Sequence, residues 1–177
     1  NDIIYLIKRN DFMLKCVVIY NPSSGKLTNR NEIKRLYKLL ENYGYDKCKK
    51  SVLESLDKMG LDYIDLMLLH QPFADYYGAY RALEDLYEEG RIRAIGVSNF
   101  YPDRLSDICL FERKIIPAIN QVETNPMNAQ FNAQKNMEKY GVHIEAWAPF
   151  GEGRNGLFEN KILVNIGKKY NKSAAQV

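Results

Sequence analysis

Four apolar runs of strand length recur along the sequence, and helical patterns separate them. The runs are YIDLMLLH (63–70), IRAIGVSNF (92–100), IPAINQV (116–122) and VHIEAWAPF (142–150), which begin 29, 24 and 26 residues apart. Strands that alternate with helices at this spacing are typical of βα units, in which crossover helices join parallel strands. The repeat therefore predicts an α/β fold whose parallel strands form a sheet or a barrel.

The segments around these runs have helical periodicity. Apolar residues fall three and four apart in KSVLESLDKMG (50–60), AYRALEDLYEEG (79–90), DRLSDICLFERK (103–114) and, more weakly, FNAQKNMEKYG (131–141). Three of these segments end at a glycine, a residue that commonly follows the last helical turn. Upstream, MLKCVVIY (13–20) predicts another strand and EIKRLYKLLENYG (32–44) another helix, so about five strands are expected.

Composition narrows the possible partners and the compartment. The 177 residues match one ordinary domain, or at most one and a half, and 25 basic against 22 acidic residues give a net charge of only +3. No like-charged run suggests a nucleic-acid partner, and no apolar run approaches the roughly 20 residues of a membrane span. The three cysteines lack disulfide or zinc-site spacing. We therefore expect a cytoplasmic protein with no nucleic-acid partner and no membrane span.

Polar or aromatic side chains stand at the ends of the four runs. They are His70, Ser98 with Asn99, Gln121 and Trp147. In parallel α/β folds the loops at the C-terminal ends of the strands face one crevice, so these side chains are expected to share it. An imidazole, a hydroxyl, two carboxamides and an indole suit a flat aromatic ligand that carries an amide.

Residues 43–177 resemble the aldo-keto reductases, (β/α)8 TIM-barrel enzymes that move a hydride between NADPH and a carbonyl compound. The resemblance rests on four phrases in order: LDYIDLMLLHQP (61–72), GRIRAIGVSNF (90–100), PAINQVETNP (117–126) and AWAPFGEG (146–153). It implies a partial TIM barrel, NADPH as the cofactor and a small-molecule carbonyl substrate.

The resemblance also implies a role for each of the strand-end residues. His70 matches the histidine that hydrogen-bonds the substrate carbonyl. Ser98, Asn99 and Gln121 match residues that hydrogen-bond the nicotinamide carboxamide. Trp147 takes the place of an aromatic ring, usually tyrosine, that stacks on the nicotinamide.

The loop after Trp147 is implied to approach the cofactor pyrophosphate. It begins with Pro149, Phe150 and Gly151, and Arg154 adds a positive charge there. The resemblance further implies that NKSAAQV (171–177) starts a helix leading to a last strand and to basic residues that hold the 2′-phosphate, which this chain does not include.

Structural alternatives exist for each of these residues. Ser98 and Asn99 also suit a cap for the helix that starts at PDRL (102–105), Gln121 suits a partner for loop backbone, and Trp147 suits the core. His70 alone would more often be a satisfied polar residue at a strand end. His143 is expected at the surface or at a strand start. DYYGAY (75–80) resembles a catalytic Asp–Tyr motif superficially but fits better as the start of the next helix.

The segment before Tyr43 departs from the reductase pattern. The family's tyrosine general acid, with its aspartate and lysine, comes from the second and third barrel strands, and no matching phrase occurs there. Residues 12–45 instead resemble the first strand, NPxSG loop and first helix of diacylglycerol and related lipid kinases. This predicts a chimera, with a lipid-kinase-like segment over 1–42 and a partial reductase domain over 43–177.

YNPSSGK (20–26) is not a Walker A loop, because the glycine and Ser/Thr positions of that motif are not filled. Its backbone N–H groups suit an anion, and an ordinary β-turn explains the same letters equally well.

Three functions stay open at this point. The chain is a reductase whose activity is low without its tyrosine, a nicotinamide-nucleotide-binding remnant, or an inactive chimera; a lipid-kinase nucleotide-binding fragment is a distant fourth. A partial barrel also has two open sheet edges, which favour self-association.

Overall fold

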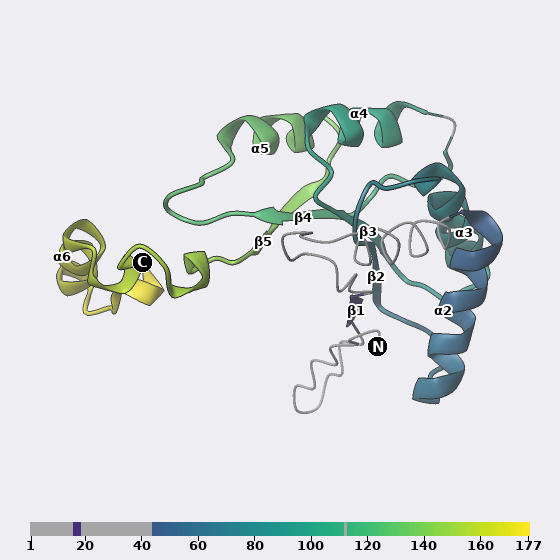
Figure 1. The fold of residues 1–177 in the computed structure, drawn as a ribbon, viewed down its shortest axis with the longest axis horizontal. Helices are drawn as coiled ribbons and strands as arrows, with labels where there is room; N and C mark the ends of the chain where they lie inside the picture. Colours follow the sequence, from purple (N-terminus) through teal and green to yellow (C-terminus); the bar gives the residue numbers. More distant parts are fainter. Residues whose placement is uncertain (1–15, 19–43, 112) are drawn as a thin grey trace, which may run out of the picture.

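A computed structural model describes residues 16–18, 44–111 and 113–177 of the chain (Figure 1). Its centre is a five-stranded sheet in the order β1-β2-β3-β4-β5, and every neighbouring pair is parallel. The strands are β1 Cys16–Val18, β2 Leu66–Leu69, β3 Ile95–Ser98, β4 Ile119–Glu123 and β5 His143–Trp147. The predicted parallel α/β sheet of about five strands is confirmed.

Four helices flank this sheet. They are α2 Tyr45–Met59, α3 Tyr76–Glu88, α4 Pro102–Leu110 and α5 Phe131–Glu138. Figure 1 shows them gathered along one side of the strands. The main hydrophobic core lies between the two layers, where strand residues such as Met67, Val97 and Val122 meet helix residues such as Leu83 and Met137.

Two local signals position α2 and α3. Gly60 ends α2 with a φ of 62°, in the left-handed region, and its N–H donates to backbone carbonyls of the last turn. Asp75 caps α3, because its Oδ1 accepts from Gly78 N at 2.8 Å. DYYGAY is therefore the start of a helix, as predicted.

The side chains of each strand alternate between the core and the opposite face of the sheet. Leu68, Gly96 and Ile119 meet on that opposite face, where a Cβ on Gly96 would clash with both neighbours. Glycine therefore allows β3 to lie close beneath them. The same alternation decides which of the polar side chains at the C-terminal edge of the sheet lie on this opposite face.

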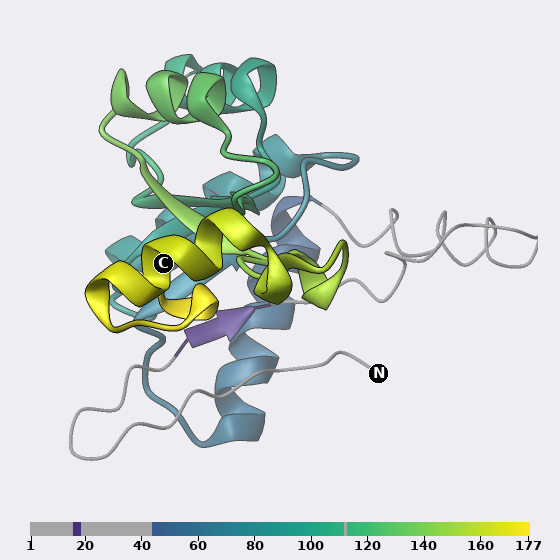
Figure 2. The same cartoon turned by 90° about the vertical axis from the view of Figure 1, so that its left-hand side faces the viewer.

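Residues 151–177 form a small unit beyond the end of β5 (Figure 1), and this unit faces the viewer in Figure 2. It comprises η1 Gly151–Gly153, η2 Leu157–Glu159, α6 Lys161–Tyr170 and η3 Ala174–Gln176. Helix α6 contacts η2 and η3, and Gly167 is its one buried residue. The helix start predicted in NKSAAQV is the short 3-10 helix η3. Within the described residues, no helix is both long and apolar enough to cross a bilayer.

Several predictions fall outside the described residues. These are the YNPSSGK loop, the helix over 32–44 and, apart from β1, the whole lipid-kinase-like segment over 1–42. Of the strand predicted over 13–20, the structure describes Cys16–Val18, which pair in parallel with β2.

Candidate functional site

The predicted strand-end residues meet at the C-terminal edge of β2 to β5, and Asn99 is at their centre. Its Oδ1 accepts from Trp147 Nε1 at 2.9 Å, while its Nδ2 donates to Ser98 Oγ at 3.2 Å and to the backbone oxygen of His70 at 3.4 Å. One carboxamide thus links the ends of β2, β3 and β5. We call this group of residues, together with Gln121, the mouth.

Backbone geometry fixes Ser98 and Asn99 in the mouth. Asn99 has a φ of 59°, in the left-handed region that asparagine tolerates better than most residues. Its N–H donates to the backbone oxygen of Gln121 at 2.9 Å, and Ser98 Oγ donates to the same oxygen at 3.0 Å. Neither residue caps α4, whose first flanking residue is Tyr101 without a side-chain hydrogen bond. The capping alternative is therefore wrong.

Gln121 lies on β4 directly beside Glu145 on β5. Its Nε2 donates to Glu145 Oε1 at 2.5 Å, so its side chain does not serve loop backbone. Sequence reasoning missed Glu145. Its position two residues before Trp147 was the available signal, because residues two apart on a strand share a face.

His70 follows β2 and is half-buried at the mouth. Burial lowers the pKa of its imidazole from the ordinary value of about 6.5, because a charged ring loses hydration there. The ring is therefore neutral at pH 7. A neutral imidazole has one N–H with which it can donate a hydrogen bond to a carbonyl oxygen.

A cavity of about 500 Å³ lies beside Trp147, between the loops that follow β4 and β5. Predicted residues Trp147, Gly151 and Arg154 line it, together with Glu123 and Asn125, which sequence reasoning missed. The guanidinium of Arg154 is 2.7 Å from the carboxylate of Glu152, so its charge is already paired.

Pro149 and Phe150 are not among the residues that line this cavity. Both are exposed, and the ring of Phe150 lies 5.7 Å from that of Phe158. The structure therefore separates these two from the other predicted site residues. His143 is the exposed first residue of β5, as expected.

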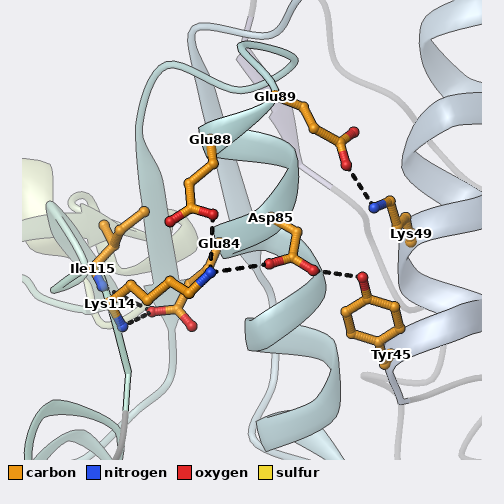
Figure 3. Close-up of polar contacts among 8 residues, drawn as sticks. All are labelled: Tyr45, Lys49, Glu84, Asp85, Glu88, Glu89, Lys114 and Ile115. Carbon is orange, nitrogen blue, oxygen red and sulfur yellow. Dashed lines mark hydrogen bonds and ion pairs between the residues drawn. The ribbon is translucent and has the colours of Figure 1, made fainter.

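A tyrosine, an aspartate and two lysines come together elsewhere, between α2 and α3 (Figure 3). Tyr45 Oη donates to Asp85 Oδ2 at 2.5 Å, Lys114 Nζ is 3.6 Å from Asp85 Oδ1, and Lys49 pairs with Glu89. The hydrogen bond to Asp85 and burial raise the pKa of Tyr45. A tyrosine acid needs the opposite shift, so this group joins helices rather than serving catalysis.

The described residues do not suit metal binding or catalysis by a cysteine nucleophile. No group of three or more histidine, cysteine, aspartate or glutamate side chains there is arranged to hold a metal. Burial raises the pKa of Cys48 to about 12 and that of Cys109 to about 11, so both remain thiols. Neither is suited to act as a nucleophile.

The family model for the Aldo/keto reductase family matches residues 14–176. Residues 14–42 fall inside that match, and the comparisons lend no support to a lipid-kinase origin for them. The chain is 42% identical over 138 residues to the glyoxal reductase of Bacillus subtilis, covering 77% of this chain and 49% of that protein. The chain spans about half the length of the curated relatives it matches.

Solved structures of the same kind share the fold. MGS-M4, an aldo-keto reductase from a Medee basin deep-sea metagenome library, has a TM-score of 0.70 at 38% identity, over 76% of this chain and 50% of that one. An aldo-keto reductase of Bombyx mori in complex with NADP has a TM-score of 0.69 at 32% identity, over 75% and 49%. The parallel βα units over about three quarters of the chain therefore share the fold of aldo-keto reductase TIM barrels, as predicted.

Proposed function

The chain belongs to the aldo/keto reductase family, and on that basis we propose that its mouth holds the nicotinamide of NADPH beside a small carbonyl substrate. The observation that carries this proposal is the network around Asn99, which brings a carboxamide, a hydroxyl and an indole to one edge of the sheet. The family uses NAD(P)H. That this chain binds NADPH rather than NADH is part of the proposal.

The donor set of the mouth fits a nicotinamide. Asn99, Ser98 and Gln121 supply the amide and hydroxyl groups that a carboxamide can pair with. The half-buried indole of Trp147 offers an aromatic face on which a flat ring can stack. The rest of the cofactor can extend from the mouth into the cavity beside Trp147, which Gly151 and Arg154 help to line.

His70 is proposed to orient the carbonyl. NADPH, when bound, supplies the hydride for the carbonyl carbon. The neutral imidazole of His70 donates a hydrogen bond to the carbonyl oxygen, where negative charge develops as the carbon is reduced. The proton that this oxygen finally takes comes from a general acid, which contributes roughly 10² to 10⁴ in rate.

Turnover by this chain is expected to be slow. Among the described tyrosines, the pKa values of Tyr45, Tyr77 and Tyr80 are all raised, for Tyr45 and Tyr77 mainly by hydrogen bonds to other side chains and for Tyr80 mainly by burial. We propose that the described residues supply nicotinamide binding and carbonyl orientation but not the tyrosine acid, because the side-chain hydrogen bonds of Asn99, Gln121 and Trp147 involve no tyrosine. The second candidate function is that of a protein that binds the nicotinamide nucleotide without turnover. It differs from the slow reductase only in the absence of catalysis.

Trp147 provides the test, since it is the single tryptophan in the sequence. Titration with NADPH is expected to quench its fluorescence in a saturable manner, and Asn99→Ala is expected to weaken that response. An unchanged spectrum at millimolar NADPH would contradict the proposal. Oxidation of NADPH with methylglyoxal, followed by absorbance, then separates a slow reductase from a binding remnant.

Two further proposals concern the chain as a whole. We retain the domain boundary near residue 42 as a prediction, and a protease-resistant fragment that begins near residue 43 would support it. We also propose a cytoplasmic location, supported by the free thiols of Cys48 and Cys109.

A further inference from the structure

The hydrogen bond between Gln121 and Glu145 has a direction, and that direction determines what the mouth offers to a ligand. We infer that Glu145 is a positioning residue that turns the Gln121 carboxamide so that Oε1, an acceptor, faces the ligand. The inference rests on the proposed function, because it names the part of the nicotinamide that Gln121 recognises, which is the N–H2 of the amide.

Strand register places both side chains on the same face. Gln121 and Glu145 are direct neighbours across β4 and β5. Val122 and Ile144, at alternate positions on the same strands, pack in or against the core. Gln121 and Glu145 therefore point away from the helices and toward the mouth, and the Nε2 to Oε1 distance of 2.5 Å joins them there.

The chemistry of the pair allows one orientation. An ionised carboxylate only accepts hydrogen bonds, so the end of the Gln121 carboxamide that meets Glu145 must be Nε2. The contact is charge-assisted, which makes it stronger than a bond between neutral groups. Gln121 is also held at its backbone oxygen, which accepts from Asn99 N and Ser98 Oγ.

The hydrogen bonds within the mouth leave only some donors and acceptors for a ligand. Both N–H groups of the Asn99 carboxamide are used, on Ser98 Oγ and on the backbone of His70. Gln121 keeps one N–H and both lone pairs of Oε1, to which no described residue donates. Gln121 thus presents mainly acceptor capacity, and a primary amide has the N–H2 to fill it.

The experiment compares two cofactors that differ at this group. In reduced 3-acetylpyridine adenine dinucleotide phosphate, a methyl replaces the amide nitrogen of NADPH. We expect the protein to bind NADPH roughly three- to tenfold more tightly than this analogue, the range for one neutral hydrogen bond. In Glu145→Gln the preference is expected to fall toward parity, because a glutamine at 145 accepts or donates and so leaves Gln121 free to turn.

Two variants control for general effects. Glu138→Gln makes the same change on an exposed residue at the end of α5, away from the mouth, and is expected to keep the preference. In a Gln121→Ala background, Glu145→Gln is expected to change the preference no further. A preference that survives Glu145→Gln, or that falls equally in Glu138→Gln, would overturn the inference.

A ligand-free measurement separates this inference from the proposed function. The Gln121 side-chain N–H2 signals are observed by NMR, and Glu145→Gln is expected to shift the signal of the proton bonded to Glu145. If neither cofactor binds, the proposed function fails and the ligand assignment fails with it, while the NMR shift still decides whether Glu145 orients Gln121. An unchanged signal would show that it does not.

Discussion

At the scale of single residues, Asn99 combines an unusual backbone conformation with a fully engaged side chain. Its φ of 59° is accessible to asparagine but costs other non-glycine residues more. Its carboxamide accepts a hydrogen bond from Trp147 and donates one each to Ser98 and to the backbone of His70. The backbone conformation of Asn99 and its side-chain hydrogen bonds therefore make separable contributions to the free energy of unfolding.

Substitution of Asn99 by alanine and by glycine separates those contributions. Asn99→Ala is expected to lower the free energy of unfolding by about 2–4 kcal/mol, because alanine in the left-handed region is strained and the hydrogen bonds are lost. Asn99→Gly loses the same bonds without the strain, and should be about 1 kcal/mol less destabilising. Urea denaturation measures both; equal losses would show that the backbone conformation contributes nothing.

His70 makes stability depend on pH in a defined direction. Because burial lowers its pKa in the folded chain, the unfolded chain binds a proton more readily. The free energy of unfolding is therefore expected to fall as pH drops below about 6.5, and to stop falling below the folded-state pKa.

The measurement is urea denaturation between about pH 5 and 7, where carboxylates stay ionised. His70→Gln should remove the His70 part of the slope, since glutamine does not titrate. His143→Gln, which removes the other histidine at an exposed position, serves as the matched control. A slope that His70→Gln does not change would contradict the assignment.

What the sequence could predict at this scale was position rather than orientation. Strand ends followed from apolar runs, so His70, Asn99 and Trp147 were correctly placed at one edge. The bond from Trp147 to Asn99, and that from Gln121 to Glu145, depend on strand register and on rotamers. Local pattern encodes neither bond; for Glu145 it could indicate only that the residue shares a strand face with Trp147.

At the scale of elements, periodicity predicted the strands and helices well and their ends less well. Helix α2 was expected from Lys50 but begins at Tyr45. Its first turn is held by contacts with α3, from Tyr45 to Asp85 and from Lys49 to Glu89, which lie 40 residues apart in sequence. Helix α6 was not predicted, although Asn160 caps it by accepting from Ile162 N at 3.0 Å.

Helix α3 also holds the connection that leads into β4. Glu84 is only 2% exposed, and its Oε1 accepts from Lys114 N at 2.6 Å and from Ile115 N at 2.8 Å (Figure 3). Glu84→Ala would leave two backbone N–H groups without this partner. We expect a loss of about 2–4 kcal/mol in the free energy of unfolding, measured by urea denaturation.

Two changes on the same helix calibrate that loss. Glu84→Gln keeps an acceptor oxygen and should cost about 1 kcal/mol. Glu88→Ala removes an exposed carboxylate that is 2.9 Å from Lys114 Nζ, and should cost less than about 1 kcal/mol. If Glu88→Ala proved as costly as Glu84→Ala, the buried bonds to the connection would not be the cause.

At the scale of the whole molecule, the sheet has two edges, formed by β1 and β5. No described strand pairs with the outer side of β5, and His143, Glu145 and Ala146 on it are exposed. An open strand presents backbone donors and acceptors to any other strand. The chain covers 49% of the glyoxal reductase of Bacillus subtilis and 50% of MGS-M4, so about half of each of these proteins has no counterpart in it.

We therefore predict that the chain associates with itself as its concentration rises, measured by sedimentation velocity. Ala146→Lys places a charge on β5 and should shift the distribution toward monomer, because a lysine on an edge strand opposes strand addition. Gln134→Lys adds the same charge on exposed α5 and should leave association unchanged. Circular dichroism checks that both variants fold. A chain that stays monomeric throughout, or an equal effect of both lysines, would show that the β5 edge is not the contact.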